Sequence, residues 1–135
     1  MGNGYGWNAA ILSAPLDEIV DRYRVDPDRI HVTGFSMGGY GTWDLAMHSP
    51  RQFATLVPIC GGGDHLRISI QMVNALDNVN VKEVNFRRYP DLMHDSWTPM
   101  YSNPDLYRWM LAHKRAIMGD EGGVPTENKV TLCQK

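Results

Sequence analysis

The sequence lacks several features that mark specialised classes of protein. It has only two cysteines, Cys60 and Cys133, in 135 residues, and their spacing fits neither a metal site nor a disulfide framework. Its formal net charge of −2 provides no basic surface for nucleic acid, so we expect no nucleic-acid partner. No apolar run is long enough to span a membrane, and the first residues lack the basic and apolar stretches of a signal peptide. Together these absences predict a soluble protein without membrane association, by default intracellular.

The pattern of hydrophobic residues predicts one α/β domain. The length of 135 residues and the hydrophobic fraction of 43% are typical of a single globular domain. Helical and strand-like segments alternate along the chain, which predicts a three-layer sandwich around a short, mostly parallel sheet. We expect this domain to cover residues 1–118, followed by a frayed polar tail over 119–135. Helices are predicted over 15–24, 40–48, 68–77 and from Asn103-Pro104 onward, and strands over 29–33, 55–60 and 82–89.

Residues 34–39 form a G-x-S-x-G-G motif between a predicted strand and a predicted helix. A serine at such a turn stands clear of the backbone, as a nucleophile must. We expect Gly34 and Gly38 to let the chain pass close to itself where a Cβ would collide. The helix that follows directs free N–H groups at the site, and that of Met37 is placed to stabilise an oxyanion. The motif predicts Ser36 as a nucleophile; the alternative is a glycine-rich turn without chemistry.

Among the five histidines, His94 is the preferred base for Ser36. It lies in a loop between the last predicted strand and the last helix, where parallel sheets gather their sites. The order serine, then histidine, also matches that of α/β-hydrolases. His65, after a glycine run, is a weaker candidate. The other three are expected to be structural or surface residues: His31, His48 and His113.

Four sequence blocks together resemble the serine-esterase branch of the α/β-hydrolases. They are Val25-Asp26-Pro27-Asp28-Arg29-Ile30, the elbow block over 33–43, the block over 58–64, and His94-Asp95-Ser96-Trp97. This branch includes predicted peptidases, phospholipase/carboxylesterase-like proteins, and relatives of feruloyl and polyhydroxybutyrate esterases. The resemblance implies Ser36 as nucleophile, His94 as base and the Met37 N–H as one oxyanion donor.

The chain departs from that family where the third member of a catalytic triad is expected. The family's His-Gly-x-x-Asp segment and the strand before it are missing, because Asp64-His65 runs almost directly into Leu66. The early strands of the family are also missing, so the chain resembles a reduced or truncated α/β-hydrolase. Asp64 keeps the order Ser, Asp, His and is the candidate acid, with a plain turn aspartate as the alternative. Asp95 is less suited, since it would have to curl back sharply onto its neighbour His94.

These observations predict a serine carboxylesterase that hydrolyses small esters through an acyl-enzyme on Ser36, with His94 as base. No metal or organic cofactor is implied. Trp97, Tyr40 and Tyr101 are candidates for an acyl or aryl pocket, with ordinary core packing as the alternative. Unpaired sheet edges predict a homo-oligomer. The rival interpretation is a truncated, inactive hydrolase domain that serves as an interaction or structural module.

Overall fold

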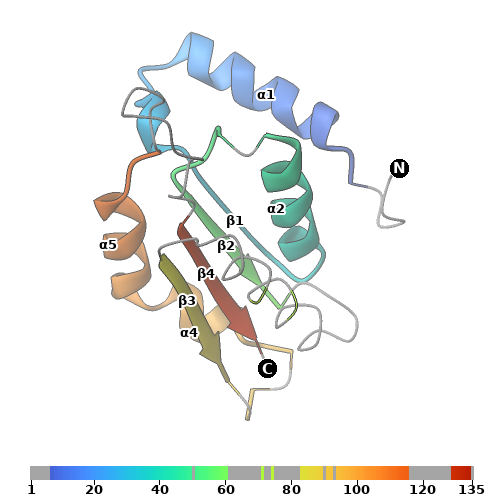
Figure 1. Ribbon diagram of the computed structural model, residues 1–135, viewed down its shortest axis with the longest axis vertical. Coiled ribbons are helices and arrows are strands. Elements are labelled where there is room, and N and C mark those ends of the chain that lie inside the picture. Colours follow the sequence, from blue (N-terminus) through green and yellow to red (C-terminus); the bar gives the residue numbers. More distant parts are fainter. Residues whose placement is uncertain are drawn as a thin grey trace.

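In the part of the chain that the structure describes, four parallel strands form a central sheet, as a computed structural model shows (Figure 1). The structure describes residues 7–49, 51–60, 71, 74, 83–89, 91–92, 94–115 and 129–134. The strand order is β1-β2-β4-β3, with each strand parallel to its neighbours. The strands are β1 (His31–Phe35), β2 (Thr55–Ile59), β3 (Glu83–Arg88) and β4 (Lys129–Gln134).

Helices cover both faces of the sheet, which gives the predicted three-layer α/β sandwich (Figure 1). Successive side chains of β2 point to opposite faces, and each face has its own apolar cluster. Leu56 packs with Trp43 of α2 (Met37–His48) and with α1 (Ala9–Arg22). Ile59 packs on the other side with Met100 of α4 (Trp97–Tyr101) and with α5 (Pro104–Ala112).

The expectation of a frayed tail is wrong for residues 129–134, which form β4 inside the sheet. β4 lies between β2 and β3, and Cys133 is in register with both Ile59 and Arg87. This strand was not predicted because the residues before it are polar and rich in glycine. It also depends on two neighbouring strands for its hydrogen bonds. Pro58 lies within β2 and pairs with Gly34 of β1, although proline cannot donate a hydrogen bond to a neighbouring strand.

The first helix begins earlier than predicted, at Ala9 rather than Pro15. The side chain of Asn8 caps it by accepting hydrogen bonds from the N–H groups of Ala10 and Ile11. Pro15 lies inside the helix, where it removes one N–H donor without ending the helix. Ala9, Leu12 and Leu16 of this helix pack on the core, whereas Ile19 is 50% exposed.

The observed bounds of α2, α5 and β1 are closer to the predicted ones. α2 ends at His48, as predicted, and Asn103 caps α5 by accepting a hydrogen bond from the Asp105 N–H. The strand before the elbow starts two residues later than expected, at His31. The short helix α4 was not predicted, and the helix expected over 68–77 lies largely outside the described residues.

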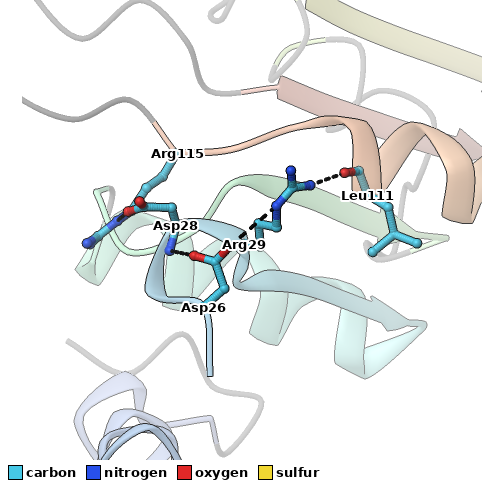
Figure 2. A network of polar contacts seen from close by, with 5 residues as sticks. All are labelled: Asp26, Asp28, Arg29, Leu111 and Arg115. Atoms are coloured by element: carbon cyan, nitrogen blue, oxygen red, sulfur yellow. Dashed lines mark hydrogen bonds and ion pairs between the residues drawn. The ribbon is translucent and has the colours of Figure 1, made fainter. Parts of the chain in front are cut away.

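A polar network ties the last helix to the turn before β1, at the end of the sheet away from the elbow (Figure 2). The 3-10 turn η1 (Pro27–Arg29) is capped by Asp26, whose carboxylate accepts from the Asp28 N–H. Arg115 binds Asp28 twice, through its backbone N–H to the Asp28 carbonyl and through Nε to Oδ1, both at 2.8 Å. Arg29 donates to the Leu111 carbonyl at the end of α5. Residues that are far apart in the sequence thereby hold α5 against the sheet.

No helix in the described part of the chain is both long and apolar enough to cross a membrane. Nor do the described histidine, cysteine, aspartate and glutamate side chains gather in a group of three or more that would suit a metal ion.

We expect Asp28→Ala to lower the free energy of unfolding by about 1–2 kcal/mol, because it removes a charge-assisted hydrogen bond between distant segments. Urea denaturation measures this value. The matched control is Glu18→Ala, which breaks an exposed ion pair with Arg22 within α1 and should cost at most about 0.5 kcal/mol. Equal losses in the two variants would contradict the role of the network.

Candidate active site

Ser36 sits in a strained turn between β1 and α2, at the carboxyl end of the sheet. Its backbone has φ 53° and ψ −118°, a conformation that non-glycine residues rarely adopt. Such a conformation costs about 1–3 kcal/mol and persists only where its surroundings enforce it. Here the Ser36 N–H donates to the Ile59 carbonyl at 2.9 Å, which fastens the turn to the end of β2. Cys60, the next residue after β2, also has a positive φ, of 40°.

Close backbone packing at Gly34 makes the turn possible. A Cβ added to Gly34 would lie 2.3 Å from the carbonyl oxygen of Gly38, a backbone atom that cannot move aside. The prediction for Gly38 itself is wrong, since a Cβ at that position would meet no atom within 4 Å. Gly41 has a different reason to be glycine: its Cβ would lie 3.2 Å from the indole of Trp7. Trp7 also donates its indole N–H to the Met37 carbonyl at 2.8 Å, so it braces the first turns of α2.

His94 meets Ser36 across 58 residues of sequence. Its Nε2 lies 3.0 Å from the Ser36 Oγ, which is the hydrogen-bond distance that a general base needs. The loop that carries His94 is held by its own backbone, because Asp95 donates to the Leu92 carbonyl and Ser96 donates to the His94 carbonyl. With His94 Nε2 accepting, the serine hydroxyl donates its hydrogen bond toward the imidazole.

Trp97 connects His94 to the strand that carries Ser36. Its ring packs on Phe35 with centroids 5.0 Å apart, and Phe35 immediately precedes Ser36. The same indole meets the His94 imidazole edge to face, with centroids 5.3 Å apart and an interplanar angle of 80°. An aromatic column therefore runs from β1 through α4 to the imidazole.

Thr33 lies two residues before Phe35, on the same face of β1, and its hydroxyl forms hydrogen bonds with β2 and with α4. Its hydroxyl donates to the Val57 carbonyl at 2.9 Å and lies 2.8 Å from the Tyr101 hydroxyl. Because the threonine proton is already committed, the Tyr101 hydroxyl is the donor to Thr33. Burial is the main cause that raises the pKa of Tyr101 above its usual value. Tyr101 therefore remains protonated near neutral pH and can keep donating this bond.

His31 continues this face of β1 and has a structural role. Its Nδ1 lies 2.8 Å from the Thr55 hydroxyl of β2, and its Nε2 is buried without a hydrogen-bond partner. Burial, followed by the nearby charges of Arg29 and His113, lowers the pKa of His31. The folded protein thus favours the neutral imidazole, which costs least to bury.

The other predicted site residues lie on α2, just before α4, or outside the described residues. Met37 is the first residue of α2, where backbone N–H groups have no acceptor within the helix, and its side chain is 57% exposed. Tyr40 lies one turn further along α2 and is half-buried. Asp95 accepts a hydrogen bond from the Thr98 N–H and so caps α4. Asp64 and His65 lie outside the described residues.

The residues that hold Ser36 and His94 in place were not predicted from the sequence. Trp7, Thr33 and Phe35 carry no chemical signature, and their contacts join segments that are distant in the chain. One signal was legible: Gly41 is a glycine inside a helix, which indicates a large neighbour close to the backbone.

Comparisons with known proteins agree with this fold. No protein-family model matches the chain, and no curated protein matches its sequence. Among solved structures, the chain is similar to the crystal structure of a thermostable esterase, with 26% sequence identity and a TM-score of 0.59. The match covers 78% of this chain and 36% of the esterase, so the chain spans about a third of the length of that protein. The comparison supports an esterase-like hydrolase fold.

We expect Gly34→Ala to lower the free energy of unfolding by about 3 kcal/mol, because its methyl group would collide with the Gly38 carbonyl. Gly38→Ala is the matched control: with open space around its Cβ, it should change stability by less than about 1 kcal/mol. Chemical denaturation of both variants measures the difference. A tolerated Gly34→Ala would show that the turn does not require this close approach.

Proposed function

We propose that the protein is a serine carboxylesterase that hydrolyses small, unhindered esters. The observation that carries this proposal is the distance of 3.0 Å between His94 Nε2 and Ser36 Oγ, at a strained strand-to-helix turn. The structural similarity to a thermostable esterase supports hydrolysis of esters at a coarse level. The serine mechanism and the size of the ester are inferred from the residues of this chain.

The reaction would proceed through two acyl transfers. Ser36 Oγ attacks the ester carbon while its proton moves to His94 Nε2, and a tetrahedral oxyanion forms. Collapse breaks the bond to the alkoxy group, which leaves as the alcohol with the proton from His94. A water then gives its proton to His94 and attacks the acyl-enzyme; the second collapse returns the proton to Ser36 Oγ and releases the acid.

Three further roles belong to this proposal. The Met37 N–H would donate to the oxyanion, because it stands at the start of α2 beside the attacking oxygen. Asp64 would be the acid that orients His94, as the order Ser, Asp, His in the sequence suggests. Tyr40 and Tyr101 would line the acyl or aryl pocket. Trp97 was predicted to lie there too, but its contacts with Phe35 and His94 favour a different role.

Ser36→Ala should reduce the hydrolysis of p-nitrophenyl acetate to the level of the buffer, because it removes the attacking oxygen. His94→Gln should lower kcat by at least about 10³-fold, since the serine then loses its base. A spectrophotometric assay of p-nitrophenol release measures both rates.

Ser49→Ala provides the control, because Ser49 caps the far end of α2 and removal of its hydroxyl should leave the rate unchanged. Equal rates for wild type and Ser36→Ala would sink the esterase proposal and favour the alternative of an inactive interaction module.

The sheet edges also lead us to propose a homo-oligomer. In the order β1-β2-β4-β3, β1 and β3 each pair with only one described strand. An unpaired edge presents backbone donors and acceptors that a second chain can satisfy. Phe35 of β1 is 47% exposed and would add apolar area to such a contact.

Size-exclusion chromatography with light scattering should therefore give a mass of at least twice the 15.3 kDa of one chain. Dilution should shift the mass downward, because association follows mass action. A mass of one chain at every concentration would rule out the oligomer.

A further inference from the structure

We propose that Trp97 is a positioning residue, which fixes the His94 imidazole against the Ser36 hydroxyl. This role differs from that of a pocket wall, and its consequence for catalysis depends on the proposed esterase function. The ring of Trp97 touches the His94 imidazole, at 5.3 Å between centroids, and the ring of Phe35, the residue before Ser36, at 5.0 Å. An indole held against Phe35 therefore sets where the imidazole lies relative to the turn of Ser36.

The indole is itself held in place from two sides. Trp97 packs against the buried cluster on this face of the sheet, which includes Ile59, Met100 and Leu106. Ile59 is also the residue whose carbonyl accepts the Ser36 N–H. The surroundings of Trp97 and the turn of Ser36 therefore share one rigid framework.

The helix that begins at Trp97 is fastened to β1 as well. Tyr101, at its other end, donates to Thr33, and the Tyr107 hydroxyl donates to the Tyr101 carbonyl at 2.7 Å. Asp95 caps the same helix through the Thr98 N–H. These bonds fix the backbone on both sides of Trp97, so its ring has little freedom to turn away from His94.

The edge-to-face contact fixes the orientation of the imidazole as well as its position. Aromatic rings favour this T-shaped arrangement over a face-to-face stack, at centroid distances of about 4.5–7 Å. The distance of 5.3 Å between the Trp97 and His94 rings lies in that range, so an imidazole that turned away from Ser36 would lose this contact.

Two kinds of measurement test this role, and the first does not depend on activity. In protein labelled with ¹⁵N-histidine, NMR signals of the His94 ring are identified by their loss in His94→Gln. Ser36→Ala should shift these signals in the wild-type background, because it removes the hydrogen bond at 3.0 Å. In the Trp97→Ala background, the same Ser36→Ala change should produce no shift, since the imidazole no longer stays on the serine. Trp97→Phe should restore the shift.

Trp109→Ala is the matched control. Trp109 packs on the same apolar cluster but contacts His113 instead of His94, with ring centroids 4.9 Å apart. This variant should keep the full Ser36-dependent shift. Trp97→Leu, which retains apolar bulk without an aromatic face, replaces Trp97→Ala if the latter does not fold. An undiminished shift in Trp97→Ala or Trp97→Leu, or no shift in the wild-type background, would overturn the proposal.

The second measurement separates positioning from substrate binding. Trp97→Ala should lower kcat by about 100-fold, the cost of a small misplacement of a catalytic group, and change KM by less than about twofold. The decrease should be the same for p-nitrophenyl acetate and butyrate. A rise in KM that grows with acyl length, at unchanged kcat, would identify a pocket wall and refute the positioning role. Wild-type hydrolysis at the Ser36→Ala level would refute the esterase function, and the NMR result would still decide the role of Trp97.

Discussion

The hydrogen bond from the Ser36 N–H to the Ile59 carbonyl holds the residue on which the site depends. It fastens a backbone conformation that Ser36 would not adopt in isolation, and the approach of Gly34 to the Gly38 carbonyl leaves the chain no alternative path. The first turns of α2 are braced in turn by the indole of Trp7. Burial of β2 between two apolar clusters keeps Ile59 in place, so the packing of the core provides the energy that maintains the strained turn.

His94 reaches this turn because one face of β1 docks the segment that follows the His94 loop. His31, Thr33 and Phe35 occupy alternate positions of β1 and therefore share that face. Thr33 contacts Tyr101 of α4, and Phe35 contacts Trp97 of the same helix. Through these contacts β1 fixes the place of α4, and α4 in turn fixes the place of the His94 imidazole. At the opposite end of the sheet, the bonds of Arg115 and Arg29 hold α5 to the turn before β1. The Ser36–His94 pair therefore lies at the carboxyl end of β1, and the polar network that holds α5 lies at its amino end.

Much of this arrangement was legible in the sequence, for physical reasons that differ between residues. Ser36 was predicted because the elbow needs glycine at a fixed spacing, and the structure shows that requirement at Gly34 although not at Gly38. The position of His94 followed from the rule that parallel strands gather loops at their carboxyl ends, and the structure brings it to Ser36. β4 was missed because a short strand between two others gains its stability from neighbours that are distant in the sequence. α4 was missed because five residues with a proline among them carry no helical periodicity.

Covalent labelling of the serine tests the central claim most directly. The protein is treated with a fluorophosphonate, and the modified residue is located by mass spectrometry of its peptides. Our account predicts a single adduct on Ser36, formed much more slowly in His94→Gln, because the reagent reads the activated nucleophile without requiring the natural ester. Absence of an adduct, or an adduct on another residue, would contradict the account.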